Sequence, residues 1–211
     1  DSVIDFDLMW EQLNRIIKPN GAIVLFGSEP FSSALRMSNI KNYKYDWIWV
    51  KNIPTGFTMA KTSPMKKHEI ISVFSDGKLT YSPNGNYLKF NPQKTKRDKP
   101  IKGYAVTSDF LHNTTFDKVP RVYTHKNPVS IIEFDKIKKG VHPTQKPILL
   151  MEYLIKTYTN EGETVLDFTM GSGSTLVACD NLNRNGIGIE MDEAYFKIAE
   201  QRIKENAHKL F

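Results

Sequence analysis

The stretch VLDFTMGSGST, residues 165–175, constrains the fold of this chain more than any other part of it. An apolar run is followed at once by a loop with two glycines, Gly171 and Gly173. Residues 174–183 then follow a helical pattern, and residues 186–190 form a second run that ends on a glutamate. A strand, a tight glycine loop, a helix and a strand with an acid at its end are typical of the nucleotide-binding half of a doubly wound α/β fold.

The rest of the chain alternates in a compatible way. Short continuous apolar runs, such as Ala22–Phe26, are typical of strands buried on both faces of a parallel sheet. We therefore predict an α/β fold with a mostly parallel central sheet and helices on both faces. The expected helices lie at residues 6–17, 30–38, 147–157, 174–183 and 192–203, and the expected strands at 22–26, 45–50, 69–74, 164–168 and 186–190.

The middle of the chain is different, because residues 77–140 show no sustained period of 3.6 or 2. This segment has 13 Lys and Arg against 5 Asp and Glu, a charge of +8 in a chain whose net charge is +6. We expect an irregular basic insertion or a small subdomain here, which divides the chain into residues 1–76, 77–140 and 141–211. An ordinary solvated surface and a surface that binds a polyanion both remain open from composition alone.

Composition removes several classes of protein. The chain has no apolar run of roughly 18 residues, and its first residues lack the apolar core of an export signal, so we expect no membrane span and a cytoplasmic protein. The lone Cys179 fits a reducing compartment and is expected in the core. The five histidines show no metal-ligand spacing with it, so we expect no metal site. Trp10, Trp47 and Trp49 are also expected to be core residues.

The residues of the glycine loop limit which ligands it can bind. Its N–H groups and the following helix N-terminus can hold an anion, and Glu190, 19 residues after Gly171, can accept hydrogen bonds from ribose hydroxyls. A Walker-type loop needs a lysine where Ser174 and Thr175 stand, and the dinucleotide fingerprint needs a glycine where Leu176 stands. A ligand with a ribose and no phosphate, S-adenosylmethionine, is left. For the loop alone, a purely structural role also remains open.

Taken together, the motifs resemble those of DNA amino-methyltransferases of the restriction-modification or phage type, with the permuted, beta-type motif order. DFTMGSGST, residues 167–175, is similar to the cofactor loop of that family, although Phe168 and Thr169 replace its Pro and Phe. HPTQKP, residues 142–147, is similar to the motif that closes over the methionine end of the cofactor. GIGIEMDEAYFKIAEQRI, residues 186–203, is similar to the ribose-binding strand and helix.

The resemblance implies a Rossmann-like S-adenosylmethionine-dependent methyltransferase fold with circularly permuted motif order. Residues 1–76 would form its catalytic half, residues 77–140 a target-recognition insertion, and residues 141–211 its cofactor-binding half. The cofactor-binding residues that it implies are His142, Thr144, Gln145, Lys146, Asp167, Phe168, Thr169, Gly171, Gly173, Ser174, Thr175, Glu190 and Met191.

The implied reaction is transfer of a methyl group to the exocyclic amine of a base flipped out of duplex DNA, with adenine favoured over cytosine. The family's catalytic Asp/Ser-Pro-Pro-Tyr motif is absent, since no Pro-Pro occurs in the chain. We expect this motif upstream of Asp1 and therefore assign no catalytic residue.

The resemblance also implies DNA as a partner and makes a homodimer and a cognate restriction enzyme possible. The expected DNA contacts are Lys94, Lys96, Arg97, Lys99 and Lys102 for phosphates, and Arg121 for base edges. Two other interpretations remain: a catalytically inactive subunit that binds DNA or a partner, and a methyltransferase acting on RNA or a small molecule.

Overall fold

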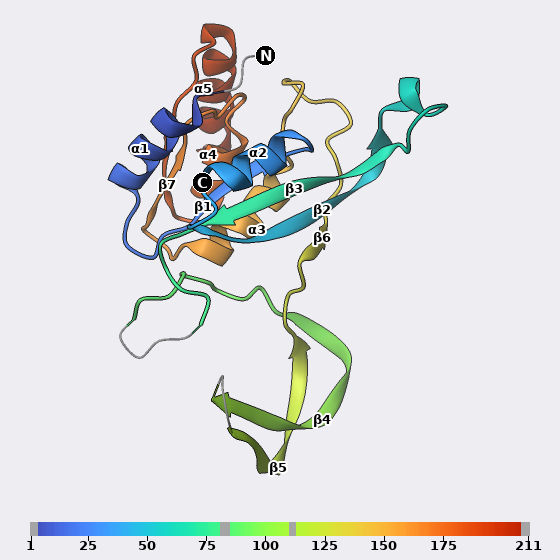
Figure 1. Ribbon diagram of the computed structural model, residues 1–211. Helices are drawn as coiled ribbons and strands as arrows, with labels where there is room; N and C mark the ends of the chain where they lie inside the picture. The colour runs from blue at the N-terminus through green and yellow to red at the C-terminus, as the bar shows by residue number, and fades with distance from the viewer. Residues whose placement is uncertain (1–3, 81–84, 110–112, 208–211) are drawn as a thin grey trace. The chain divides into compact units, whose positions relative to one another are not determined.

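The computed structural model of the chain describes residues 4–80, 85–109 and 113–207 (Figure 1). The chain divides into two compact units, Asp1–Asn91 with Ser130–Phe211, and Pro92–Val129. Each unit is described by itself.

The first unit contains every helix and strand that the sequence predicts for it. Boundaries differ by a few residues, and the largest difference is that two hairpin strands, β2 and β3, run further than expected. Asp5 caps the first helix, since its side chain accepts a hydrogen bond from the Leu8 amide at 3.1 Å. The elements in chain order are α1 Phe6–Ile16, β1 Ile23–Gly27, α2 Phe31–Ser38, β2 Tyr43–Thr55, the 3-10 helix η1 Phe57–Met59, β3 Lys66–Phe74, β6 Ile131–Glu133, α3 Ile148–Tyr158, β7 Thr164–Asp167, α4 Ser174–Asn181, β8 Asn185–Gly188 and α5 Glu193–Ala207.

Strand direction corrects one detail of the predicted fold. The described strands form a four-stranded sheet in the order β1-β3-β2-β6 and a separate parallel pair, β7-β8. Within the larger sheet β2 pairs with β6 in parallel, but β3 is antiparallel to both β1 and β2. Three of these four strands, β1, β2 and β6, therefore run in one direction, as expected of a mostly parallel sheet. Only β3 runs against them, because β2 and β3 form a direct hairpin, which permits only antiparallel pairing. A continuous apolar run in the sequence indicates that both faces of a strand are buried, but it does not indicate whether the strand runs parallel or antiparallel to its neighbours.

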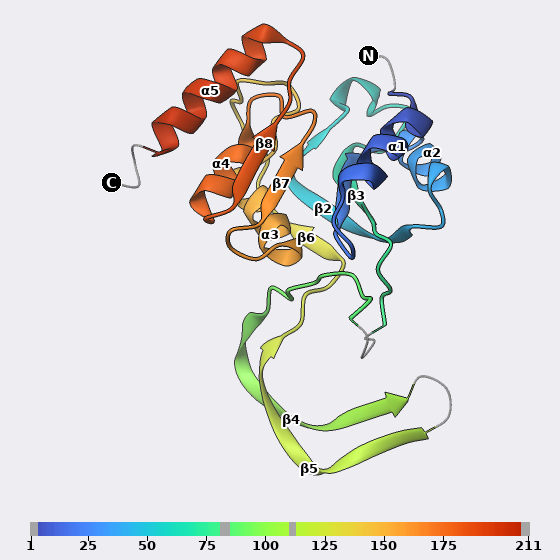
Figure 2. The same ribbon diagram turned by 90° about the vertical axis from the view of Figure 1, so that its left-hand side faces the viewer.

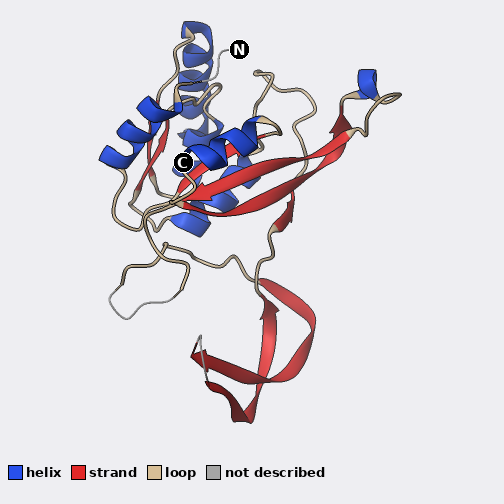
Figure 3. Ribbon diagram, in the orientation of Figure 1, coloured by secondary structure: helices blue, strands red, loops and turns tan. Residues whose placement is uncertain are grey.

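Helices cover both faces of the larger sheet, as the sequence predicts (Figures 1 and 3). On one face α3 packs against Trp47, Trp49 and neighbouring strand residues, and on the other α1 and α2 pack around Phe74. Trp10, Trp47 and Trp49 are all buried, which confirms them as core residues. The indole N–H of Trp47 donates to the Tyr158 hydroxyl at 2.7 Å, so this buried polar group is satisfied.

The parallel pair β7-β8 lies beside α4 and α5 (Figure 2). Cys179, on α4, is fully buried with Ile155 and Ala178 in a third apolar cluster. Burial raises the pKa of the Cys179 thiol to about 12, which makes it a packing residue and not a nucleophile.

The second unit is a two-stranded antiparallel hairpin, β4 Thr95–Asp109 and β5 Asn113–Lys126. Of the two expectations for this part of the chain, irregular structure was wrong, because the segment is a regular hairpin in a compact unit of its own. Most side chains at residues 94–103 and 120–126 are exposed, so these parts of the strands bury no face whose alternation a sequence pattern could reveal.

The hairpin unit is also shorter than the expected segment 77–140. Leu88 is buried in the cluster under α3, and the Asn91 amide donates to the Thr157 carbonyl at 2.7 Å. The residues just before the hairpin therefore pack with the first unit.

Candidate functional site

The glycine loop lies between β7 and α4. Asp167, at the end of β7, forms hydrogen bonds with both ends of this loop. One carboxylate oxygen of Asp167 accepts from the Thr169 amide at 3.1 Å. The other accepts from the Thr175 hydroxyl in the first turn of α4. Gly171 and Gly173 have φ values of +52° and +76°, a backbone conformation that favours glycine. The loop is thus folded tightly by its own residues.

The two glycines have different surroundings. A Cβ built at Gly171 lies 3.4 Å from the His142 ring, inside the candidate site. A Cβ built at Gly173 lies 2.9 Å from the Ala199 Cβ, on α5. The resemblance implies both glycines as cofactor-binding residues, but the space beside Gly173 is filled by α5. Glycine is needed there for helix packing.

Glu190 faces the loop, as expected, although it lies two residues beyond β8 instead of ending that strand. One of its carboxylate oxygens accepts from the Gly171 amide at 2.8 Å, and the other from the Asp192 amide at 2.9 Å. Each oxygen keeps a further lone pair for a ligand hydroxyl. Its neighbour Met191 is 99% exposed. Glu190 therefore joins the loop to the segment after β8 while its outer lone pairs remain available.

The HPTQKP segment lies against the same loop. The His142 ring packs on Tyr195 of α5, with ring centroids 4.2 Å apart. Its Nδ1 lies 3.2 Å from the Thr144 amide and 3.1 Å from the Thr144 hydroxyl. The Gln145 side chain stabilises the start of the segment, because its Oε1 accepts a hydrogen bond from the Val141 amide at 2.9 Å. These contacts place the His142 ring beside Gly171.

Lys146, the last charged residue of that segment, reaches the larger sheet. Its ammonium lies 3.0 Å from one oxygen of Glu69, whose other oxygen lies 3.3 Å from the Lys51 ammonium. It also lies 5.1 Å from the centre of the Phe26 ring. Burial alone would raise the pKa of Glu69, but the two lysines outweigh it and hold this pKa below its ordinary value. Lys146 is therefore positioned by an ionised Glu69.

Sequence reasoning missed Arg202, Tyr195, Lys51 and Glu69. Arg202 on α5 donates to the Ser172 carbonyl and hydroxyl and lies 3.4 Å from the Ser174 hydroxyl. Burial lowers the pKa of Arg202. A basic residue on an amphipathic helix is typical of a solvated face, so the sequence held no signal for this contact.

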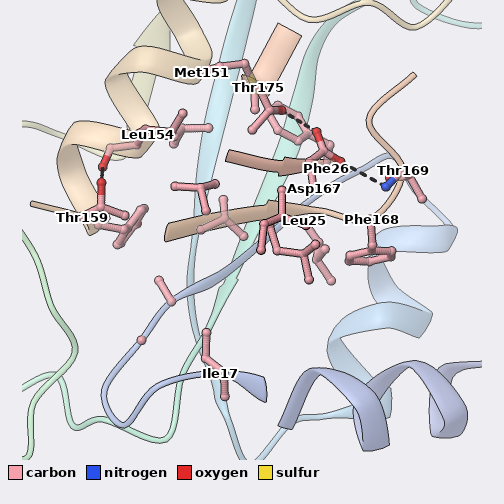
Figure 4. Close-up of a pocket in the computed structure, with 18 of the residues that line it drawn as sticks. Ile17, Leu25, Phe26, Met151, Leu154, Thr159, Asp167, Phe168, Thr169 and Thr175 are labelled. Atoms are coloured by element: carbon pink, nitrogen blue, oxygen red, sulfur yellow. Dashed lines mark hydrogen bonds between the residues drawn. The ribbon is translucent and has the colours of Figure 1, made fainter. Parts of the chain in front are cut away.

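A cavity of about 1040 Å³ opens beside the loop (Figure 4). Among the predicted cofactor residues, Gly173, Glu190 and Met191 do not line it. Those that do are His142, Thr144, Gln145, Lys146, Asp167, Phe168, Thr169, Gly171, Ser174 and Thr175. The cavity continues from this polar end along the edges of β1 and β7, because successive residues of each strand line it although side chains alternate between faces. It thus has a polar end at the loop and an apolar stretch along the strands, and beyond that stretch its lining includes polar residues such as Asn20, Lys89 and Glu163.

The predicted DNA contacts lie on the hairpin unit. Residues 92–129 contain eight Lys and Arg against three Asp, so they carry +5 of the chain's net +6. Lys94, Lys96, Lys99, Lys102 and Arg121 are exposed. Arg97 is partly buried, and its Nε donates to the His125 carbonyl at 3.1 Å, so this side chain has a structural contact as well.

The hairpin register separates two of these residues. Lys102 pairs with Val122 and Gly103 pairs with Arg121. Since successive side chains of a strand point to opposite faces, Lys102 and Arg121 lie on opposite faces of the ribbon. A contact through one flat face would use only one of them.

No helix in the part of the chain that the structure describes is both long and apolar enough to cross a membrane.

The model of a DNA methylase family with N6 and N4 amino specificity matches residues 6–201. That match covers most of the chain, which therefore belongs to the N6/N4 DNA methylase family. Among curated proteins, it is 28% identical over 209 residues to the type II methyltransferase M.HpaI of Haemophilus parainfluenzae. It is 45% identical over 71 residues to the type II methyltransferase M2.DpnII of Streptococcus pneumoniae. The matches cover 95% and 33% of this chain, but 59% and 26% of those proteins, so the chain spans only part of their length.

Solved structures confirm the Rossmann-like methyltransferase fold. The M1.HpyAVI–SAM complex matches with a TM-score of 0.61 and 26% identity, over 96% of this chain and 84% of that one. The cytosine-N4-specific PvuII DNA methyltransferase matches with a TM-score of 0.62 and 14% identity, over 97% and 76%. At that lower identity the second match shows the fold alone.

Proposed function

We propose that this chain binds S-adenosylmethionine and forms the cofactor-binding part of an enzyme that methylates an exocyclic base amine in duplex DNA. One observation carries the proposal: the glycine loop and the HPTQKP segment line the polar end of one cavity, and Glu190 accepts a hydrogen bond from the Gly171 amide of that loop. The structural relative M1.HpyAVI was solved with SAM, which supports the same ligand here.

The residues present fit the parts of this ligand. Glu190 offers outward lone pairs for ribose hydroxyls. The first amides of α4, at Ser174 and Thr175, have no intrahelical acceptor and suit the methionine carboxylate. Phe168 supplies an apolar wall near the loop, and Lys146 closes the other side. The cavity is at the upper end of the range of about 300–1,000 Å³ that is usual for small-ligand sites.

Bound S-adenosylmethionine would supply the methyl group. The chain's own contribution is to hold and orient that ligand, through Glu190 and the loop amides, at the strand ends. The target base must leave the DNA stack to present its amine to the cavity. The carboxylate and carbonyl acceptors that the resemblance assigns to a Pro-Pro motif have no counterpart in residues 1–211, so we assign the transfer step to no residue here.

We propose duplex DNA as the substrate because the hairpin unit presents a concentrated positive charge. Lys94, Lys96, Lys99 and Lys102 would contact phosphates, with Arg97 adding to them, and Arg121 would read base edges. Adenine as the target base, a homodimer and a cognate restriction enzyme are proposed from the resemblance alone. A cytoplasmic location is proposed from the sequence, in which the lone Cys179 fits a reducing compartment.

Calorimetric titration of the chain with S-adenosylmethionine tests the proposal. We expect wild-type binding and a roughly tenfold or greater loss in Glu190→Gln, since a hydrogen bond to a charged group contributes about 1.5–3 kcal/mol. Glu193→Gln is the matched control, because the Glu193 side chain is 81% exposed and pairs with Lys197 four residues later on the same helix.

Wild-type protein that binds DNA but not S-adenosylmethionine would favour the inactive-subunit interpretation. Stronger competition by RNA than by duplex DNA would favour an RNA methyltransferase. Unchanged affinity in folded Glu190→Gln protein would contradict the ribose assignment.

A further inference from the structure

The hairpin between β2 and β3 projects from the larger sheet as an arm, with η1 at its tip (Figures 1 and 3). We call residues 52–68 the β2–β3 arm. From Val50, paired with His68, to Thr55, paired with Lys66, β3 advances two residues, roughly 7 Å at about 3.3 Å per residue, while the extra residues of β2 form an irregularity. Residues 56–65 continue beyond the last pair, so the arm presents its tip away from the body of the first unit.

The tip of the arm exposes large apolar side chains. Phe57 is 80% exposed and Met59 is 59% exposed, and both lie on η1. Ile53 and Met65, lower on the arm, are 40% and 37% exposed. Single exposed apolar residues are ordinary, but four on one projecting hairpin indicate an interaction site.

The tip is held in one conformation by hydrogen bonds. Gly56, at φ +90°, starts the turn, and its carbonyl accepts from the Met59 amide at 3.0 Å. The Met59 carbonyl accepts from the amides of Thr62 and Ser63, each at 2.9 Å. The exposed rings and thioethers are thus presented by a folded turn, which lowers the entropy cost of inserting them into a partner.

The charge of the arm indicates the kind of partner that it can bind. Residues 52–68 contain Lys61, Lys66 and Lys67 and not one Asp or Glu. An apolar tip on a purely cationic stem fits a polyanion with an apolar interior, and a stacked nucleic-acid duplex has both properties.

The base of the arm adjoins the candidate site. Lys51 on β2 and Glu69 on β3 lie next to the arm and form an ion pair at 3.3 Å, and Glu69 also contacts Lys146, which lines the cavity. The arm therefore starts directly beside the candidate site.

We propose that the β2–β3 arm is a DNA wedge, in which Phe57, supported by Met59, inserts between base pairs beside the target and its lysines contact the flanking phosphates. The inference rests on the proposed action on duplex DNA. Inserted apolar side chains unstack and untwist a duplex, so the wedge facilitates removal of the neighbouring base from the stack.

The test measures untwisting, which needs no knowledge of the target sequence. A closed circular plasmid is relaxed by a topoisomerase with saturating protein, and the topoisomers are compared after the protein is removed. Wild-type protein should shift the distribution. Phe57→Ala should abolish most of the shift and weaken duplex binding by on the order of tenfold, the usual effect of removing one aromatic side chain that stacks on a base. Phe57→Trp should keep both.

Two further variants separate insertion from attraction. Met37→Ala removes an apolar side chain that is 69% exposed on α2, away from the arm, and should change neither property. Lys61→Gln with Lys67→Gln should weaken binding and flatten its salt dependence, while the topoisomer shift per bound protein stays.

An unchanged topoisomer shift in Phe57→Ala overturns the wedge, even where DNA binding and S-adenosylmethionine binding are intact. Phe57-dependent binding to vesicles with phosphatidylserine, without any topoisomer shift, overturns it in favour of a lipid surface. Absence of duplex binding by wild-type protein overturns both this inference and the proposed DNA substrate.

Discussion

At the scale of single residues, Gly171 and Gly173 show how similar backbone angles can serve different purposes. Both have positive φ, but only Gly173 points its missing side chain into a helix, with the Ala199 Cβ 2.9 Å from the position of a built Cβ. The sequence could predict the loop and the need for glycine. It could not predict which partner approaches each glycine, because Ala199 is distant in sequence.

We expect Gly173→Ala to destabilise the fold by about 2–5 kcal/mol, from backbone strain of about 1–2 kcal/mol and overpacking of about 1–3 kcal/mol. Gly162→Ala is the control, since Gly162 has the same φ of +76° and nothing within 4 Å of a built Cβ. It should cost the strain alone. Urea unfolding of the two variants measures the difference, and equal destabilisation would show that contact with Ala199 does not matter.

At the scale of elements, most of the predicted helices and strands were found because they bury an apolar face that periodicity reveals. The strand β8 is an exception, since its residues are mostly exposed. Two features escaped this signal. The direction of β3 depends on its hairpin with β2, which burial does not report. Residues 95–103 of β4 and 120–126 of β5 are mostly exposed, so they leave no pattern of alternating burial. In the candidate site, the glycine loop and the HPTQKP segment could be predicted because they are sequence motifs. Arg202 and Glu69 could not, because they act through contacts with residues that are distant in sequence.

The hairpin of β4 and β5 carries the element-scale prediction. Changing Lys94, Lys96, Lys99 and Lys102 to Gln should weaken binding to duplexes of different sequence about equally. The slope of log affinity against log salt should become shallower by up to about 0.9 for each phosphate that the variant no longer neutralises. Arg97 is left unchanged because its side chain also holds the His125 carbonyl.

The control for this measurement is Lys197→Gln with Lys204→Gln on α5, two exposed lysines that pair with glutamates one turn earlier. This pair should have little effect on the slope. If the four hairpin changes also leave it unaltered, these lysines do not contact phosphate.

At the scale of the whole molecule, charge and core are divided between the two units. Every residue of the three apolar clusters belongs to the first unit, whereas residues 92–129 carry +5 of the net +6.

Replacing residues 92–129 by a flexible Gly/Ser linker should therefore leave cooperative unfolding and S-adenosylmethionine binding close to those of the intact chain. The reason is that every cluster keeps all of its members and that long surface loops add little closure entropy. Duplex binding should fall steeply, because the remaining body has 21 Lys and Arg against 20 Asp and Glu. Thermal unfolding, calorimetry and a DNA titration on the same preparation measure the three properties. Loss of the cooperative transition would mean that the hairpin stabilises the body, and duplex affinity that survives the deletion would assign DNA binding chiefly to the first unit, including the β2–β3 arm.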